Sequence, residues 1–365
     1  MYNSKSKEGQ NLEYVSCCLC GGNTFDNVLI SNYVSPSNHQ TIDDGSSNSI
    51  METFNLVRCR NCGLQQVNPR PSKQHIGRYY TEDYYAHTSL KVKKPKKKSL
   101  FAGKWIDFKD DVRRLIRVKF YNYPCSLEDK DRNISVSKRI FSWLFYLTYR
   151  SRLDIIPFTG EGKILDLGCG NGRFLSTMRK FGWQTYGVEK NPTASRYARD
   201  ELHLDVKTGE LLHYQFESSS FDTVTMWHSL EHLYDPLCTL KEIGRVLNNN
   251  GQLIVAVPNI DSFVAKVFKT YWYGLQLPIH LIAFTPGSIT KMLNQAGFDV
   301  KKIYLDRRGA TLRLSLLNLK DGKYRVLSRL SRFKGAIKAL NFILAMFGSC
   351  DIIVIHARKK ATCDV

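Results

Sequence analysis

The chain has 365 residues, of which 43% are hydrophobic and 24% charged, with 11 prolines and 24 glycines. This composition excludes a disordered, collagen-like or coiled-coil protein, and the length leaves room for more than one domain. The 53 lysines and arginines against 33 aspartates and glutamates give a net charge of +20. Such a charge indicates an anionic partner, whether nucleic acid, a phosphorylated molecule or an acidic membrane surface.

The excess positive charge is concentrated in two segments. Residues 1–90 carry a net charge of −1 and residues 151–310 of +2, whereas residues 91–150 carry +11 and residues 311–365 carry +8. We therefore predict four parts. They are an N-terminal domain over 1–90, a basic, partly helical linker or cap over 91–150, a core over 151–310, and a basic helical segment with a final strand over 311–365.

The N-terminus has no apolar stretch of the kind that a signal peptide needs, and no segment approaches the ~20 apolar residues that span a bilayer. The sequence therefore predicts a cytoplasmic protein. Its 10 cysteines are expected to be reduced thiols in that compartment.

Four cysteines lie in two Cys-x-x-Cys-Gly turns, Cys17 with Cys20 and Cys59 with Cys62. The glycine after each pair permits a positive φ, and the two turns together supply four thiolates for one tetrahedral zinc ion. Such a site is structural, because four thiolates leave no open coordination position. Cys18 is an alternative ligand in the first pair, and ordinary buried cysteines are the alternative to zinc.

A glycine-rich turn follows a short apolar strand over 163–167 and precedes a helix over 174–182. Glycines let the backbone approach a ligand at the carboxyl end of a strand. A second strand, over 184–189, ends in an acid that can accept hydrogen bonds from both hydroxyls of a ribose. The candidate ligand-binding residues here are Asp166, Gly168, Cys169, Gly170, Gly172 and Glu189.

This pattern, Asp-x-Gly-x-Gly-x-Gly with a later acid, resembles the S-adenosylmethionine site of class I methyltransferases and not the G-x-G-x-x-G of dinucleotide folds. The resemblance implies an α/β fold with a doubly wound, seven-stranded, mainly parallel sheet. It implies that Asp166 suits the cationic amino-acid end of the donor. In the family, positions that correspond to Gly168, Cys169 and Gly170 contact the methionine part of the donor, and the position of Glu189 contacts the ribose. The positions of Glu210 and Leu211 contact the adenine. The positions of Trp227 and His228 line the mouth of the site.

Strands and helices alternate over the rest of the core, which favours a parallel sheet. We expect a strand over 221–226, a helix that ends at residues 248–251, and a strand over 252–259. A helix over 284–298 and strands over 300–306 and 351–360 follow.

Methyl transfer from a sulfonium requires an aligned acceptor and a group that removes its proton. His228, His232 and His280 follow predicted strands and are the candidate bases. The pattern His228-x-x-Glu231-His232 is similar to the Glu-x-x-Glu-His of quinone O-methyltransferases, whose residues bind a divalent cation, although His228 replaces the first acid. A helix cap is the alternative role for Glu231 and His232. We expect the segment 272–286 to form a wall over the acceptor, with His280 facing the methyl group.

The cysteine turns, the segment 63–71, the pair Tyr79 and Tyr80, and the core together resemble a subgroup of bacterial class I methyltransferases. Members of that subgroup often belong to surface-polysaccharide or nucleotide-sugar pathways. The resemblance implies in-line methyl transfer to a hydroxyl or amine of a sugar, nucleotide-sugar or polysaccharide intermediate. The alternatives are an RNA methyltransferase, a quinone- or lipid-type O-methyltransferase, and a catalytically inert zinc-containing nucleic-acid-binding protein.

The two basic segments have a composition of their own. A lysine-rich run covers 91–98, and apolar stretches over 140–147 and 336–347 lie beside basic residues. Basic residues next to aromatic-rich helices fit attachment to anionic lipid at the inner face of a membrane. A helical cap that packs on the core is the alternative. The expected partners are thus a small-molecule or glycan acceptor, which can be phosphorylated, an anionic membrane, and nucleic acid as a further option.

Overall fold

A computed structural model describes residues 11–34, 51–80, 100–124, 135–149, 156–305, 310–319, 325–347 and 349–360. The described residues fall into two compact units. The first gathers residues from 1–84, 228–241 and 255–353, and the second gathers residues from 85–227, 242–254 and 354–365. The lysine-rich run at 91–98 lies outside the described residues.

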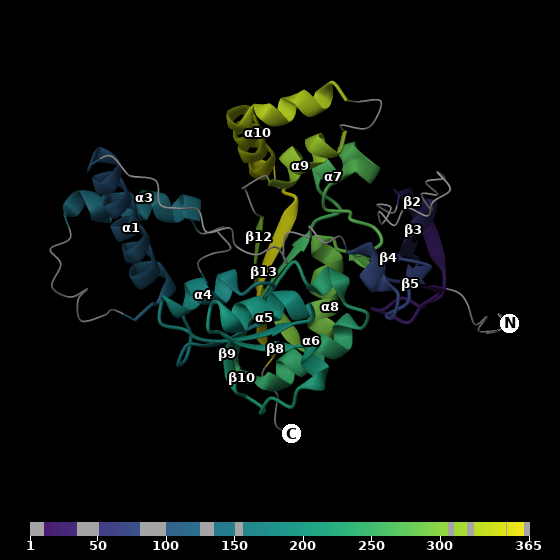
Figure 1. Ribbon diagram of the computed structural model, residues 1–365, viewed down its shortest axis with the longest axis horizontal. Helices are drawn as coiled ribbons and strands as arrows, with labels where there is room; N and C mark the ends of the chain where they lie inside the picture. Colours follow the sequence, from purple (N-terminus) through teal and green to yellow (C-terminus); the bar gives the residue numbers. More distant parts are fainter. Residues whose placement is uncertain are drawn as a thin grey trace, which may run out of the picture. The chain divides into compact units, whose positions relative to one another are not determined.

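Seven strands form one sheet in the order β12-β13-β10-β9-β6-β7-β8 (Figure 1). Strand β6 pairs in parallel with β7 and β9, and β7 pairs in parallel with β8. With the helices around it, this sheet confirms the predicted α/β, doubly wound, mainly parallel fold class. The strands are β6 Lys163–Leu167, β7 Gln184–Glu189, β8 Asp205–Thr208, β9 Phe221–Trp227, β10 Leu247–Pro258, β12 Phe298–Leu305 and β13 Ile352–Lys359.

Several helices begin after residues whose side chains cap free N–H groups. The Asn191 side chain accepts from Ala194 N at 2.9 Å before α5, and Thr285 and Ser288 form a capping box before α8. A proline at the first position suits both helices. The described helices after β6 are α4 Arg173–Arg179, α5 Pro192–Asp200, α6 Pro236–Val246, α7 Phe263–Phe268, α8 Pro286–Gln295, α9 Ala310–Asn318 and α10 Lys334–Met346. Short 3₁₀ turns are η1 Ile76–Tyr79, η2 Leu211–His213, η3 Leu230–His232, η4 Lys269–Tyr271 and η6 Leu327–Arg332.

The boundary between α6 and β10 differs from the prediction. The helix ends at Val246, and the strand begins at Leu247 instead of residue 252. Asn and Gly in sequence predict a turn, but Asn248 donates from Nδ2 to Asp222 Oδ1 at 2.5 Å. This long-range contact holds the asparagine run in extended conformation, and a sequence pattern does not show such contacts.

The N-terminal residues form a second, four-stranded sheet in the order β11-β4-β3-β2. Its strands are β2 Phe25–Val34, β3 Met51–Cys59, β4 Gln65–Val67 and β11 Ile282–Ala283. The pairing of β4 with β11 is antiparallel, and the Val67 N–H donates to the Leu281 carbonyl at 2.9 Å. A further pair joins β1 (Leu12–Glu13) to β5 (Arg70–Pro71). The N-terminal segment therefore shares a sheet with the segment that carries His280.

Two helices fall in the basic segment before the core. Helix α1 (Leu100–Tyr121) and helix α3 (Val136–Tyr149) pack against each other (Figure 1). Phe108 meets Phe141 edge to face with ring centroids 5.5 Å apart, and Phe120 stacks on Tyr146 at 4.1 Å. Among the described residues, no helix has both the length and the apolar content needed to cross a membrane.

Candidate active site

The predicted glycine turn follows β6 directly and leads into α4. Gly168, Gly170 and Gly172 have φ values of 74°, 54° and 75°, in the left-handed region that glycine adopts without strain. A Cβ atom on Gly172 would lie 2.5 Å from Leu204 Cδ1, so a larger residue does not fit there. The three glycines therefore allow a turn that brings backbone N–H groups to the carboxyl edge of the sheet.

Glu189, at the end of β7, holds this turn in place. The Gly170 N–H donates to Oε2 at 2.8 Å and the Asn191 N–H donates to Oε1 at 2.7 Å. The residue is buried. A carboxylate oxygen can accept two hydrogen bonds, so each oxygen retains capacity for a hydroxyl donor. The predicted ribose contact is thus compatible with the structural bonds.

Asp166 lies inside β6 and is buried. Thr225 donates a hydrogen bond from its hydroxyl to Oδ1 at 2.7 Å. Burial is the main cause that raises the pKa of Asp166, the Thr225 hydrogen bond opposes it and the charge of Glu189 adds to it, and together they bring this pKa to about 7. The carboxyl group therefore changes charge near neutral pH.

The other residues predicted to contact the donor lie around the same strands. Cys169 and Leu211 are buried, and burial raises the pKa of the Cys169 thiol well above its usual value. Glu210 forms an ion pair with Lys190 at 3.2 Å. Trp227 ends β9, packs edge to face on Phe174 at 5.2 Å, and has a buried indole N–H without an acceptor among the described residues. That free donor is available to a ligand.

His228 and Glu231 follow β9 and belong to the first unit. His228 has a φ of 55°, a strained conformation for a residue with a side chain, and its N–H donates to the Ala256 carbonyl at 2.9 Å. Glu231 is fully buried, and His228 Nδ1 lies 3.4 Å from its Oε1. Burial raises the pKa of Glu231, but its contact with His228 and the other nearby histidines outweigh this effect and lower the pKa overall. Glu231 is therefore a buried carboxylate.

His232 and His280 come from different segments and meet with ring centroids 4.7 Å apart. His232 Nδ1 lies 2.9 Å from the Ile279 carbonyl and 3.2 Å from the Tyr80 hydroxyl. His280 Nδ1 lies 2.8 Å from the Gly274 carbonyl. Because a carbonyl only accepts hydrogen bonds, both rings carry their proton on Nδ1, which leaves the lone pair on Nε2.

Glu231, His232 and His280 together have the geometry of a cation site. One ligand atom from each lies within 4.8 Å of the other two. Neither Glu231 oxygen accepts a hydrogen bond of good geometry from the described residues, which is costly for a buried charge. The fit of these residues to a divalent cation rests on this unsatisfied carboxylate and on histidines whose Nδ1 atoms are already fixed by carbonyls.

His280 is buried, and this burial lowers its pKa to about 3, with the charge of His232 acting in the same direction. Its ring is therefore neutral at neutral pH. The surrounding segment is tightly held, since Trp272 is buried and Gln276 has a φ of 36°. A ring with so low a pKa is a poor proton acceptor, whereas its neutral form is the one that binds metals.

The two cysteine turns have the same backbone pattern. Cys17 N donates to Gly22 O and Gly21 N to Cys17 O, and Cys59 N donates to Leu64 O and Gly63 N to Cys59 O, all at 2.8–2.9 Å. The Sγ atoms of Cys17 and Cys62, and of Cys20 and Cys59, are 3.5 Å apart, and all four lie within 4.8 Å of one another. Sulfurs of a tetrahedral zinc site with Zn–S bonds of about 2.3 Å are about 3.8 Å apart. The cysteine cluster thus fits zinc, and Cys18 lies outside it.

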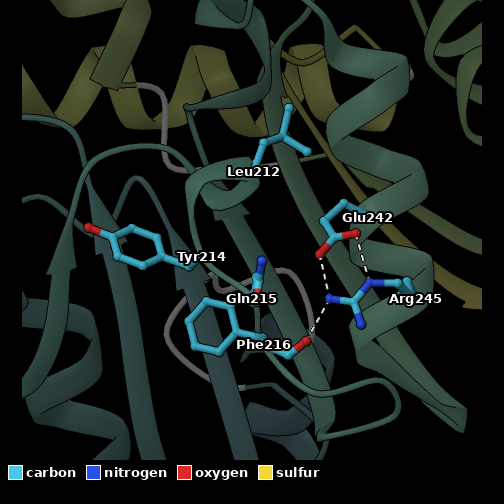
Figure 2. A pocket seen from close by; sticks show the side chains of 6 residues that line it. All are labelled: Leu212, Tyr214, Gln215, Phe216, Glu242 and Arg245. Carbon is cyan, nitrogen blue, oxygen red and sulfur yellow. Dashed lines mark hydrogen bonds and ion pairs between the residues drawn. The ribbon is translucent and has the colours of Figure 1, made fainter.

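A separate pocket of about 350 Å³ lies beside η2 and α6 in the second unit. Figure 2 shows the Arg245 guanidinium between the Glu242 carboxylate and the Phe216 carbonyl, which it meets at 2.7 Å and 2.6 Å. The pocket contains none of the predicted site residues, and its charged groups satisfy each other. We therefore do not place the chemistry there. Its lining residues are Leu212, Tyr214, Gln215, Phe216, Glu242 and Arg245.

Two residues at the cluster of Glu231, His232 and His280 are not among the predicted site residues. In the sequence, Glu231 is part of a motif, with a helix cap as its alternative role. Tyr80 is part of the family resemblance alone, and the structure places its hydroxyl 3.2 Å from His232 Nδ1. The spacing His-x-x-Glu-His was the available signal for Glu231, whereas no local signal exists for Tyr80.

Comparison with known proteins places this arrangement in a family. A family model described as a methyltransferase domain matches residues 142–303. The chain is 30% identical over 197 residues to the mitochondrial ubiquinone biosynthesis O-methyltransferase of Schizosaccharomyces pombe. The aligned region covers 47% of this chain and 69% of that protein. It is also 30% identical over 156 residues to the ubiquinone biosynthesis O-methyltransferase of Xanthomonas euvesicatoria, and this alignment covers 39% of this chain and 64% of that protein.

A solved S-adenosylmethionine-dependent methyltransferase from Mesorhizobium loti resembles the chain with a TM-score of 0.40 and 16% identity, over 59% of this chain and 97% of that one. A similarity this low does not bear on function. The sequence match to the first relative spans more than two thirds of that enzyme, and the matched domain contains the glycine turn after β6 and the histidines after β9. The chain belongs to the class I S-adenosylmethionine-dependent methyltransferases.

Proposed function

We propose that the protein transfers a methyl group from S-adenosylmethionine to a hydroxyl of a small phenolic acceptor, the quinone-type alternative of the sequence analysis. The observation that carries this proposal is the cluster of Glu231, His232 and His280, in which Glu231 and His280 are buried. The names of the relatives, which are ubiquinone biosynthesis O-methyltransferases, support it. These names favour a phenolic acceptor over the sugar or polysaccharide acceptor that the subgroup resemblance implies.

The donor is assigned to the residues after β6, β7 and β9. The glycine turn would lie against the methionine part, and Glu189 would accept hydrogen bonds from the ribose. Asp166 would face the cationic end of the donor, and the free indole N–H of Trp227 would donate to the ligand. Gly168, Cys169, Gly170, Gly172, Glu210 and Leu211 complete this proposed set. We likewise propose residues 151–310 as the methyltransferase core.

Glu231, His232 and His280 would hold a divalent cation. A bound cation supplies a Lewis acid that lowers the pKa of an acceptor hydroxyl. His228 lies next to this cluster, with 23% of its side chain accessible, and it contacts the Glu231 carboxylate. We assign His228 the removal of the acceptor proton, and Glu231 keeps its ring oriented. His280 is assigned to the cation, because its low pKa makes it a poor base.

The acceptor is tested by transfer of labelled methyl from S-adenosylmethionine in an extract, with the product sorted into lipid-soluble, glycan, RNA and protein fractions. Label in the lipid-soluble fraction, and on catechol-type phenols supplied in vitro, is the expected result. Label in glycan or RNA would replace the proposal by one of the other predicted acceptors. Failure to bind S-adenosylmethionine in calorimetry would contradict the donor assignment itself.

We further propose that Cys17, Cys20, Cys59 and Cys62 hold a structural zinc ion in the N-terminal segment, residues 1–90. Protein purified without added metal is then expected to contain about one tightly held zinc per chain. The Glu231→Gln variant, which removes a ligand of the separate cation site, should contain the same amount of zinc. The Cys20→Ser variant should lose this zinc and melt at a lower temperature. Cys238→Ser, at an exposed cysteine, is the matched control. A zinc content well below one per chain would refute the site.

Binding of S-adenosylmethionine is expected to strengthen as the pH rises through about 7, because Asp166 with a pKa of about 7 then becomes an anion beside the donor cation. In the free protein the sign is opposite. The folded-state pKa lies above 3.8, so the contribution of Asp166 to stability falls as the pH rises from 3.8 to about 7. Calorimetric titrations on both sides of pH 7 measure the first effect. An Asp166→Asn variant with an unchanged pH profile would contradict it.

A further inference from the structure

We propose that η6 and α10 form a surface that binds anionic lipid. This η6–α10 surface consists of eight exposed apolar side chains within the described segment 325–347, namely Val326, Leu327, Leu330, Phe333, Leu340, Phe342, Ile343 and Phe347. It lies outside the region that the methyltransferase domain model matches. The inference goes beyond the proposed reaction, because binding to vesicles is measured without methyl transfer.

Helix α10 carries apolar side chains beyond the side that it buries. Ile337 and Asn341 are buried, and Ile337 packs with Leu312 and Leu316 of α9. Leu340 and Ile343 of the helix and Phe347 just after it, spaced three and four residues apart, lie on a neighbouring side and are 46%, 49% and 80% exposed. A helix that needs only one apolar side to join a core would carry polar residues on the other. The outer side therefore has a further partner.

The charge of the segment identifies that partner. Residues 325–347 contain five basic residues and no acidic one. Arg325, Arg329 and Arg332 are exposed beside the apolar side chains of η6. Apolar side chains flanked by arginines match the interface of an anionic membrane, where the rings enter the acyl region and the guanidinium groups meet lipid phosphates. A second copy of the same surface would bring like charges together.

The test uses the full-length protein and vesicle flotation. Vesicles of phosphatidylcholine with phosphatidylglycerol are expected to carry the protein to the top of the gradient, and vesicles of phosphatidylcholine alone to carry much less. Salt should weaken the binding, because it screens the arginines. The double variant Phe342→Asp with Phe347→Asp should lower the partition coefficient about tenfold or more, since both rings leave the lipid. Phe342→Leu with Phe347→Leu should retain it.

Matched controls separate this surface from others. Phe263→Asp with Val267→Asp changes two side chains on α7 that are 53% and 56% exposed, and should bind like the parent protein. All variants must keep the parent circular dichroism spectrum. Equal binding to neutral and anionic vesicles, or no binding, would overturn the proposal. The proposal would also fail if the double aspartate variant floated like the parent protein. It would fail if the protein bound RNA instead of lipid and the aspartate variant still bound RNA, or if the parent protein were a dimer in gel filtration and the aspartate variant a monomer.

Discussion

Replacing Glu231 by glutamine is expected to abolish the binding of a divalent cation and to lower kcat by about 100-fold or more. The carboxylate is the only formal negative charge among the three clustered ligands, and removal of a ligand or its support typically costs 10- to 100-fold in metal affinity or activity. Electron paramagnetic resonance of added Mn²⁺ measures the binding directly, without reference to turnover. Co²⁺ spectra distinguish this oxygen and nitrogen site from the cysteine cluster.

The Glu242→Gln variant is the matched control, because Glu242 is paired with Arg245 and is not one of the proposed cation ligands. It should bind Mn²⁺ and turn over like the parent enzyme. A His280→Gln variant should weaken Mn²⁺ binding as well. If Glu231→Gln bound Mn²⁺ normally, the cation assignment would fail, while the methyltransferase assignment would stand.

The second large effect is expected at Glu189. Glu189→Gln should weaken S-adenosylmethionine about 100-fold, because two hydrogen bonds to a charged acceptor, each contributing about 1.5 kcal/mol, lose their charge. In the wild-type protein, the two carboxylate oxygens accept hydrogen bonds from the Gly170 and Asn191 N–H groups. A glutamine amide has one oxygen and one NH₂ group, which only donates, so it cannot accept both hydrogen bonds in the same way. Isothermal titration calorimetry with S-adenosylmethionine and S-adenosylhomocysteine gives the affinities.

Glu201→Gln provides the comparison, since Glu201 is an exposed acid just after α5. Its affinity for S-adenosylmethionine should stay within a factor of about two. The melting temperature of Glu189→Gln without ligand shows how much of the loss comes from the turn itself. An unchanged affinity at Glu189 would remove the ribose assignment.

The fold was predictable because its signals are local. A short apolar strand before Gly168, Gly170 and Gly172 determines a turn that few backbones adopt, and alternating strands and helices indicate a parallel sheet. Strand β7 was predicted with the bounds that the structure shows, Gln184–Glu189. Such features depend on residues that are close in sequence.

The cation cluster was predictable only in part, because it depends on contacts between distant segments. His-x-x-Glu-His places Glu231 and His232 near each other, but the meeting with His280 requires the fold. The burial that lowers the pKa of His280 to about 3 is likewise a property of packing. The sequence favours His280 as the base that faces the methyl group, whereas its burial makes it a poor one.

One short strand ties the cysteine turns to this cluster. Strand β4 begins three residues after Cys62 and pairs with β11, which begins two residues after His280. Between them, the backbone of Leu281 donates to the Glu231 carbonyl and accepts from Val67, both at 2.9 Å. With the zinc site and the cation site proposed above, oxidation of the thiols or loss of zinc would loosen the support of the segment that carries His280. On these two proposals, the cellular redox state and zinc supply would have a physical route to the rate of methylation.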